Sequence, residues 1–356
     1  MTSIEIPLRN GERMTIRRLR PPLGDYAQHV GSWSFIKDEL LRGDLADSLL
    51  AEFFVGEIDG AVVGSTSYYT PTDTRDVGVV EFVQTSESQR GEGVGGALMA
   101  ALVEAFEGAG GLALYLCTVN PIAGRLYETC GFKYRVGDGM RRLTPGAEDF
   151  DETYLTHTGK ASVREAVWGD LPRAAVLYNH PYPPWLLKDP LSDSFRTTRY
   201  ERHFAALMRR IEDGQGAAFV LESPRRRMVG VAAFARRQTY HEQHVATLGF
   251  RVHPGHTEQT SMLLASACER AAQLGVSRLE LPVAEVDRDQ ADLVRAAGFP
   301  QEARLRGRVR DGSNWRDVLI FAWRSDIDPE PWRAPETFYG HRQPWQAERA
   351  AEVGDA

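Results

Sequence analysis

A glycine-rich run separates a strand-like segment from a helix-like segment in the first third of the chain. The run reads Arg90-Gly91-Glu92-Gly93-Val94-Gly95-Gly96, with Val77–Thr85 before it and Ala97–Glu107 after it. Glycines allow close approach to the backbone, the first amides of a helix lack internal partners, and the helix dipole favours negative charge. The run therefore predicts an anion site, for which a pyrophosphate group is the best match.

The strand-like segment before the run alternates between two kinds of side chain. A period of two predicts one face with Val79, Glu81, Val83 and Thr85, and an opposite face with Val80 and Phe82. This alternation places Glu81 on the same face as Val83 and Thr85.

Three other kinds of glycine-rich turn fit part of the pattern. A dinucleotide-binding turn follows the first strand of its unit, whereas three strand-like segments come first here. A Walker loop requires Lys-Ser or Lys-Thr after the last glycine, where Gly96-Ala97 stand. A flexible turn without a ligand is the third alternative for the glycines taken alone. The spacing Arg90-x-x-Gly93-x-Gly95 after a long strand instead resembles the acyl-CoA loop of the GNAT N-acyltransferase superfamily.

A second motif, about thirty residues downstream, makes the resemblance specific. Residues 120–132 read Asn-Pro-Ile-Ala-Gly-Arg-Leu-Tyr-Glu-Thr-Cys-Gly-Phe, which matches the family signature Asn-x-x-Ala-x-x-x-Tyr-x-x-x-Gly-Phe at every marked position. Asn120 suits a helix N-cap and Pro121 the first helical position, while Gly131 suits a left-handed C-terminal cap. By these two motifs the first half is identified as a member of the superfamily.

The resemblance implies a fold and a set of cofactor contacts. The implied fold is α/β (α+β), with a mixed central sheet flanked by helices, and the implied co-substrate is acetyl-CoA, without a metal. The family's diphosphate contacts correspond to Arg90, Gly91, Gly93, Val94, Gly95 and Gly96. The pantetheine arm is expected along the backbone of Val83 and Thr85, with Asn120 and Ala123 as further cofactor-binding positions.

The resemblance also implies two catalytic roles. Tyr127 would protonate the departing thiolate, since a phenol with a pKa near 10 suits a thiol leaving group. Tyr127 as a purely structural core residue is the alternative. Glu81 would withdraw the proton of the attacking amine, often through water, or would only bind and orient the acceptor.

The pattern of the first half starts again after residue 160. Val229-Gly230 matches Val63-Gly64, and Ala297-Gly298-Phe299 matches Cys130-Gly131-Phe132. We therefore expect two tandem GNAT-like domains. The predicted divisions are a catalytic domain at 1–158, a degenerate GNAT-like domain at 159–325, and an aromatic and proline-rich tail at 326–356.

The second copy has lost the residues on which the chemistry depends. Its loop after the central strand 245–252 lacks Gly-x-Gly and carries Glu258, a carboxylate that would repel a diphosphate. Counting back four residues from Gly298, as Tyr127 lies four before Gly131, gives Val294, which cannot donate a proton. We expect this half to bind no acyl-CoA.

Two further expectations concern the first half. Its closing strands are predicted at Lys133–Val136 and Thr153–His157, with an irregular connection between them. Trp33, Phe35 and Asp38 fall in the segment that forms part of the acceptor pocket in the family, so they are candidate pocket residues, with burial of the two aromatics in the core as the alternative.

Composition narrows the cell compartment and the partners. No segment approaches the roughly 20 apolar residues of a membrane span, and three widely spaced cysteines suggest reduced thiols of a cytoplasmic protein. No basic stripe indicates nucleic acid as a partner. Residues 1–158 carry 14 basic and 23 acidic side chains, which mildly favours a cationic amine as substrate.

The function predicted from the sequence is N-acetyltransfer from acetyl-CoA to a small-molecule amine by direct attack, in a monomer or homodimer. Tandem architecture also resembles mycothiol synthase, which acetylates a cysteinyl amine, but that family normally keeps its active copy second. A non-enzymatic acyl-CoA-binding or sensing protein is the alternative from a different class; an intact Tyr127 and Glu81 count against it.

Overall fold

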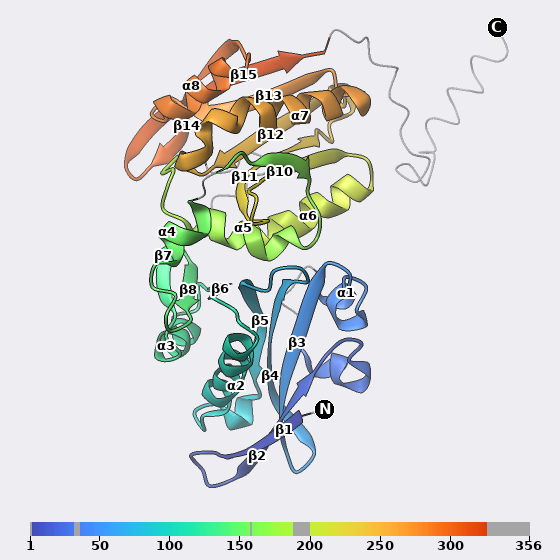
Figure 1. Cartoon of the computed structure of the whole chain (residues 1–356), viewed down its shortest axis with the longest axis vertical. Coiled ribbons are helices and arrows are strands. Elements are labelled where there is room, and N and C mark those ends of the chain that lie inside the picture. The colour runs from blue at the N-terminus through green and yellow to red at the C-terminus, as the bar shows by residue number, and fades with distance from the viewer. Residues whose placement is uncertain (1, 32–35, 157–158, 188–199, 326–356) are drawn as a thin grey trace, which may run out of the picture.

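The computed structural model describes residues 2–31, 36–156, 159–187 and 200–325. The chain folds around two sheets that lie one above the other along the long axis of the molecule (Figure 1). Trp33, Phe35 and the tail 326–356 lie outside the described residues, so their predicted roles stay untested.

The first sheet has eight strands in the order β1-β2-β3-β4-β5-β6-β8-β7. Neighbouring strands are antiparallel except β5 and β6, which are parallel. The strands are β1 (Thr2–Pro7), β2 (Arg13–Leu19), β3 (Leu49–Ile58), β4 (Ala61–Pro71), β5 (Val77–Thr85), β6 (Ala113–Cys117), β7 (Lys133–Val136) and β8 (Gly139–Leu143). The chain reverses between β3 and β4 at Asp59-Gly60, a residue pair typical of hairpin turns, with positive φ at Asp59 (50°) and Gly60 (80°).

Helices of the first half connect these strands. They are α1 (Lys37–Arg42), α2 (Val94–Gly108), α3 (Pro121–Thr129) and α4 (Phe150–Leu155), with short 3₁₀ turns η1 (Gly24–His29) and η2 (Glu87–Gln89). The apolar positions of α2 at Leu98, Leu102 and Phe106 are buried against the sheet, where Phe106 meets Tyr68 edge-on at 5.5 Å between ring centroids. This packing fixes the start of α2 relative to β4 and β5.

The closing strands differ from the prediction at one position. β7 is found as predicted, but its partner is β8, and the segment expected as the last strand begins inside helix α4. The reason is a tight turn: Gly137 adopts a positive φ of 55°, so the chain reverses at once and Gly139–Leu143 returns between β6 and β7.

The alternation predicted along β5 is wrong beyond Glu81, because the strand contains a β-bulge. Register pairs Ser67 with Glu81 and Ser65 with Gln84, so β5 holds one more residue than β4 between these pairs. Phe82 lies at the bulge with a positive φ of 56°, in the left-handed region that bulky residues rarely adopt.

The bulge changes which side chains share a face of the first sheet. Val83 packs against the buried cluster beneath α2, and Thr85 follows it by two residues. Phe82 belongs to the cluster on the other side, which includes α5 and also Val79, two residues before Glu81. Glu81 therefore lies on the opposite face from Val83 and Thr85. We name these sides the α2 face and the α5 face.

The second sheet has seven strands in the order β14-β15-β13-β12-β11-β10-β9, with one parallel pair, β12 and β13. The second sheet, read from β9 to β14, has the same strand order and the same strand directions as the first sheet read from β2 to β7. The strands are β9 (Ser162–Glu165), β10 (Gly216–Glu222), β11 (Met228–Arg236), β12 (Val245–Val252), β13 (Arg278–Ala284), β14 (Gln301–Asp311) and β15 (Asn314–Arg324). Two mixed α/β sheets of one topology fit the predicted tandem arrangement.

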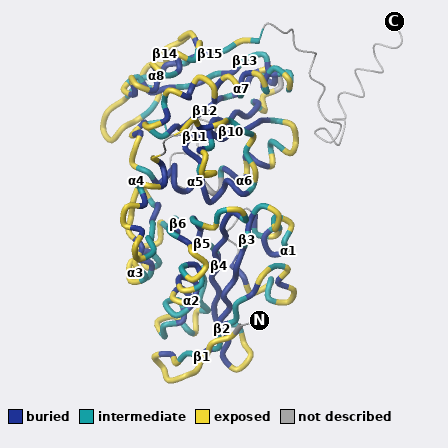
Figure 2. The backbone as a smooth tube through the Cα atoms, in the orientation of Figure 1, coloured by how far each residue is buried: buried dark blue, intermediate teal, exposed yellow. Residues whose placement is uncertain are grey.

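Helices of the second half include one that both halves share. They are α5 (Asp170–Asn179), α6 (Tyr200–Glu212), α7 (Thr260–Gln273) and α8 (Arg288–Ala296), with 3₁₀ turns η3 (Tyr240–Glu242) and η4 (Pro254–Gln259). All ten residues of α5 are buried, and the helix packs against β4, β5 and β6 as well as β11 (Figure 2). One hydrophobic cluster therefore runs from the first sheet through α5 into the second.

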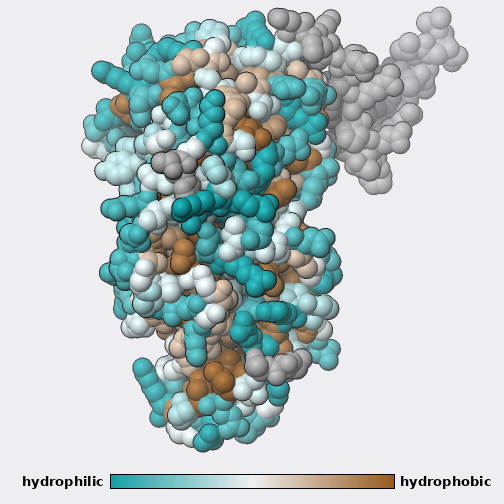
Figure 3. All heavy atoms as spheres, in the orientation of Figure 1, coloured by the Kyte–Doolittle hydropathy of each residue, from teal (hydrophilic) through white to brown (hydrophobic). Residues whose placement is uncertain are grey.

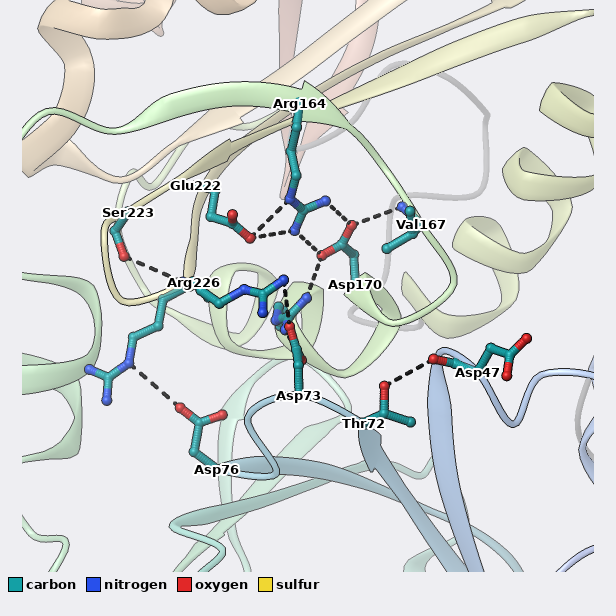
Figure 4. Close-up of polar contacts among 12 residues, drawn as sticks. Asp47, Thr72, Asp73, Asp76, Arg164, Val167, Asp170, Glu222, Ser223 and Arg226 are labelled. Carbon is teal, nitrogen blue, oxygen red and sulfur yellow. Dashed lines mark hydrogen bonds and ion pairs between the residues drawn. The ribbon is translucent and has the colours of Figure 1, made fainter.

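Polar contacts also join the two halves (Figure 4). Asp170, fully buried at the start of α5, accepts hydrogen bonds from Arg164 at 2.7 Å and from Arg173 at 3.0 Å. Arg173 bonds in turn to Asp73, in the loop between β4 and β5, and Arg226 lies 3.3 Å from the same carboxylate. Burial opposes the charge of Arg173, but its ion pairs outweigh burial and leave its pKa raised. The buried arginine thus ties α5 to the first sheet.

The outer surface is mainly polar. On the face drawn in Figure 3, hydrophilic side chains predominate over both halves, and hydrophobic atoms form small separate groups. Among the described residues, no helix combines the length and the apolar character needed to cross a membrane.

Candidate active site

The glycine-rich run forms a preshaped turn at the start of α2. Gly91 and Gly93 adopt left-handed conformations with φ of 90° and 98°, and Gly93 is the N-cap of the helix. A side chain at either position is strained, which accounts for glycine at these two sites. Arg90 is extended between η2 and the turn, and its exposed guanidinium pairs with Glu87 at 3.3 Å.

The turn presents a set of backbone amides without acceptors. Within the described part of the chain, five backbone N–H groups of this turn have no hydrogen-bond acceptor. They belong to Gly91, Gly93, Val94, Gly95 and Gly96. These amides coincide with the glycine-run positions that the resemblance assigns to the diphosphate. Unpaired amides at a helix N-terminus form an anion site, so the local geometry fits a phosphate-bearing ligand.

Gly95 joins the turn to two neighbouring elements. A β-carbon built on Gly95 would lie 3.2 Å from Leu126 of α3 and 3.4 Å from Oγ1 of Thr85. The absence of a side chain therefore lets α2, α3 and the end of β5 meet. Thr85, like Val83, lies on the α2 face, so the structure brings these predicted contacts to the side of the sheet where the amides lie.

The parallel strands β5 and β6 diverge beside this turn. They pair over only three positions, Val77 with Ala113, Gly78 with Leu114 and Val79 with Tyr115. Beyond Val79, the edge of β5 that faces β6 has no partner strand among the described residues. An edge of unpaired N–H and C=O groups accepts an extended ligand as an additional strand. The gap therefore suits an extended, amide-containing chain such as pantetheine.

Two serine hydroxyls on β4 support the bulge in β5. Ser65 Oγ donates to the carbonyl of Phe82 at 3.2 Å, and Ser67 Oγ donates to the carbonyl of Glu81 at 3.3 Å. Because a bulge interrupts the regular ladder, these hydroxyls replace donors that backbone amides supply elsewhere. Sequence reasoning missed them, although two serines at alternate positions of a buried strand were a visible signal.

Glu81 stands half-buried on the α5 face. On the same face Gln84 donates a hydrogen bond to the carbonyl of His29, which brings η1 beside the strand. The face therefore combines a carboxylate with a short connection from the segment that the resemblance assigns to acceptor binding.

Tyr127 lies on the other side of the sheet, in the cluster beneath α2. Its side chain is 8% exposed, and its ring packs against Phe132 with 6.1 Å between centroids. Burial, together with the nearby Cys130, raises the pKa of Tyr127 to about 12. No hydrogen bond joins its hydroxyl to another described side chain or backbone group. The phenol is therefore protonated at neutral pH.

The helix that carries Tyr127 is capped as predicted. Asn120 Oδ1 accepts hydrogen bonds from the amides of Ile122, at 2.9 Å, and Ala123, at 3.4 Å, and Pro121 occupies the first helical position. Ala123 packs against the cluster beneath α2. The carbonyl oxygen of Asn120 is thus used for capping, and its amide group remains to contact a cofactor or a water.

The second half lacks the corresponding residues. Because Val229-Gly230 matches Val63-Gly64, Ala233 of β11 corresponds to Ser67 of β4. Ala233 pairs with Gly249 and Ser67 pairs with Glu81, so Gly249 is the counterpart of Glu81. The pairing of β11 with β12 runs without a shift, so β12 has no bulge. Val294, at the position equivalent to Tyr127, is fully buried.

The chain itself occupies the gap beside β12. Arg251, buried on one side of the strand, donates to the carbonyls of His180, at 3.0 Å, and Tyr182, at 3.3 Å. Trp185, 2% exposed, packs edge-on against Phe250 with 5.2 Å between centroids. Adjacent residues of a strand point to opposite faces, so the segment between Tyr182 and Trp185 crosses the sheet beside β12. Pairing of β12 with β13 ends at Thr247, which leaves room for this crossing.

Helix α8, the counterpart of α3, anchors the same segment. Trp185 Nε1 donates to Asp289 at 3.0 Å, and the amide of Leu186 donates to Asp287 at 2.7 Å. Burial and the nearby Asp289 raise the pKa of Asp287 to about 6, although the amide of Leu186 opposes that shift. An indole ring of the chain itself is therefore held between β12 and the start of α8 in the second half.

These features define a class of site: a mixed α/β sheet with one diverging parallel pair and an anion-binding turn at a helix N-terminus. Residues 21–132 match the model of the Acetyltransferase (GNAT) family. The first half of the chain therefore contains a GNAT acetyltransferase domain, and the protein is an acyltransferase.

Solved structures of acetyltransferases resemble part of the chain. One is a ribosomal-protein-alanine N-acetyltransferase from Brucella melitensis, with 22% identity and a TM-score of 0.40 over 46% of this chain and 99% of that one. Another is a phosphinothricin acetyltransferase from Sinorhizobium meliloti in complex with acetyl-CoA, with 17% identity and a TM-score of 0.43 over 50% of this chain and 98% of that one. A search among curated proteins gives no match.

Proposed function

We propose that the protein is an acetyl-CoA-dependent N-acetyltransferase that acts on a small-molecule amine. The proposal assigns catalysis to a domain at 1–158 and a degenerate GNAT-like domain to 159–325, followed by the tail 326–356. The observation that carries it is the set of five unpaired amides at the start of α2, beside a gap between β5 and β6. An anion cradle and an open strand edge match the two ends of one ligand, the diphosphate and pantetheine of CoA.

Donor binding uses the α2 face. The amides of Gly91, Gly93, Val94, Gly95 and Gly96 would hold the diphosphate, with Arg90 reaching it from the loop. The backbone of Val83 and Thr85 would pair with the pantetheine arm, and the free amide group of Asn120 would contact the cofactor or a bound water. When bound, acetyl-CoA supplies an activated acyl group, whose C–S bond breaks as the new C–N bond forms.

Two side chains on opposite faces would move the protons. Glu81, on the α5 face, would accept the proton that the amine nitrogen loses, directly or through a water. Tyr127, beneath α2, would donate its hydroxyl proton to the departing sulfur, and its raised pKa keeps that proton in place at neutral pH. In this arrangement the acceptor amine would enter the gap from the α5 face, and the donor would enter it from the α2 face.

The experiment is a measurement of free CoA thiol released from acetyl-CoA in the presence of a panel of amines, cysteinyl amines included. We expect release that depends on both the amine and Tyr127, with an acetylated amine as product. Tight binding of acetyl-CoA without release for any amine would favour an acyl-CoA sensor. Selective acetylation of a cysteinyl amine would favour a mycothiol-synthase-like substrate instead.

A further inference from the structure

The N-terminal hairpin of β1 and β2 contacts the anion-binding turn. The amide of Arg9 donates to the carbonyl of Glu92 at 3.1 Å, and Arg9 Nη1 donates to the carbonyl of Gly91 at 3.2 Å. Gln89 Nε2 adds a hydrogen bond to Glu12 at 3.1 Å. Among the strands that the structure describes, the second sheet has no counterpart of β1, so this contact is described for the first half alone.

These contacts place a guanidinium group beside the amide cradle. A β-carbon built on Gly93, the N-cap of α2, would lie 3.8 Å from Cγ and 4.0 Å from Nε of Arg9. One of the five guanidinium N–H groups bonds to Gly91, and the side chain is exposed. The remaining N–H groups are therefore accessible to a ligand on the turn.

Arg9 and Arg90, the arginine assigned to the diphosphate from the sequence, differ in their ion pairing. Arg90 already forms an ion pair with Glu87 at 3.3 Å. Among the described residues, no carboxylate lies within ion-pairing distance of Arg9. An anion on the turn would therefore gain a full positive charge from Arg9, whereas at Arg90 it would compete with a carboxylate.

We propose that Arg9 is a further binding residue for the diphosphate of the acyl-CoA donor, an inference that rests on the proposed function. Guanidinium groups bind phosphate oxygens through parallel, charge-assisted hydrogen bonds. The diphosphate is the part of CoA assigned to Arg9, because Arg9 bonds to Gly91 and lies against Gly93, whose amides form the cradle. The hairpin thus adds a cation to a site otherwise built from backbone.

The test is calorimetric titration of the full chain with acetyl-CoA, dephospho-CoA and acetyl-pantetheine. The variants are Arg9→Gln, Arg9→Lys and the matched control Arg13→Gln, whose arginine pairs with Glu5 at 3.0 Å on the same hairpin. We expect Arg9→Gln to weaken acetyl-CoA and dephospho-CoA alike by about tenfold, in line with one charge-assisted hydrogen bond. Arg9→Lys should recover part of the loss. Acetyl-pantetheine, which lacks the diphosphate, should bind all variants equally, and Arg13→Gln should match the wild type.

The salt dependence of binding shows whether Arg9 contacts a phosphate or only stabilises the turn through its bond to Gly91. Because salt screens exposed charges, the affinity of the wild type should fall more steeply with salt than that of Arg9→Gln. Equal salt slopes in the two proteins, or an unchanged affinity in Arg9→Gln, would overturn the inference. A loss for acetyl-CoA but not for dephospho-CoA would move the contact from the diphosphate to the 3′-phosphate and overturn it as stated. A wild type that binds no acetyl-CoA would instead overturn the proposed function.

Discussion

The two halves share one strand order, yet they differ at every feature of the candidate site. The first half has a bulge at Phe82, an acidic residue at Glu81 and a phenol at Tyr127. The second half has a regular β12 without a bulge, Gly249 in place of Glu81 and Val294 in place of Tyr127. The common topology is maintained by apolar packing, and packing tolerates the loss of polar groups that only a ligand requires. A shared fold therefore does not preserve a shared site.

The gap beside the parallel pair shows the same contrast. In the first half the edge of β5 has no partner strand beyond Val79 among the described residues, whereas in the second Trp185 packs on Phe250 beside the diverging strands. A gap between strands costs stability unless something fills it, because its walls lose packing contacts. In the second half the chain fills the gap, and in the first half we propose that a substrate does.

The largest effect is expected at the turn itself. Gly95→Asp should lower the affinity for acetyl-CoA on the order of 10³-fold, because several charge-assisted hydrogen bonds are lost and a carboxylate repels the diphosphate. Its side chain would also meet Leu126 and Thr85. The matched control is Gly255→Asp in the loop of the second half, which should bind as the wild type does. Calorimetry that shows equal losses in both variants would remove the distinction between the halves.

A large effect on stability is expected at the filled gap. Trp185→Ala should lower the free energy of unfolding by about 3–5 kcal/mol, as large-to-small changes in a core do. Trp315→Ala, at a position 66% exposed on β15, is the control and should cost far less. Urea unfolding gives the stability, and calorimetry should show unchanged affinity for acetyl-CoA. A stable Trp185→Ala variant would mean that the indole is dispensable to the second half.

Removal of the phenol should affect chemistry more than binding. Tyr127→Phe is expected to lower turnover by about 10²-fold, within the usual range for general acid catalysis, with little change in donor affinity. Tyr134→Phe, at a tyrosine 48% exposed on β7, is the control. Initial rates of thiol release under conditions where chemistry limits turnover provide the measurement. Wild-type turnover in Tyr127→Phe would show that another group protonates the sulfur.

The smallest effect concerns the loop of the second half. Burial, aided by the neighbouring His180, His256 and Arg251, lowers the pKa of His253 to about 4. Between that value and its ordinary pKa near 6.5, the unfolded chain binds a proton that the folded chain does not. Stability from this histidine is therefore complete above pH 6.5 and is lost as the pH falls toward 4.

The variant His253→Asn tests this pH dependence, since asparagine retains an acceptor for the amide of Gly255. From pH 7 to pH 5 the wild type should lose about 1 kcal/mol more unfolding free energy than the variant, since solvent screens this partly exposed imidazole and reduces the full effect of the shift. Urea titrations at the two pH values provide the comparison. Parallel losses in both proteins would show that His253 is not held neutral by the fold.

Local sequence patterns predicted the elements of the site well. Glycines with positive φ and the Asn120 cap each depend on residues within a few positions of one another. The predicted strands and helices around the glycine run are confirmed for the same reason. The Gly137 turn was missed, because a single glycine does not distinguish a tight reversal from an irregular connection.

Local sequence patterns could not predict contacts between segments that are distant in the sequence. The bulge places Phe82, a non-glycine residue, at positive φ, so the residue type gave no sign of the bulge. The prediction that Glu81 shares a face with Val83 and Thr85 was therefore wrong. Arg9 meets Gly91 across 82 positions of sequence, and α5 packs against both sheets. Only the tertiary arrangement brings these groups together.

The number of acetyl-CoA molecules that one chain binds tests most directly whether the donor site lies in the first half alone. Calorimetric titration of the wild type should give one site per chain, and titration of Gly95→Asp at the same concentrations should give none. Binding of two molecules per chain, or one molecule retained at wild-type affinity in a folded Gly95→Asp variant, would contradict the assignment of the donor site to the first half alone.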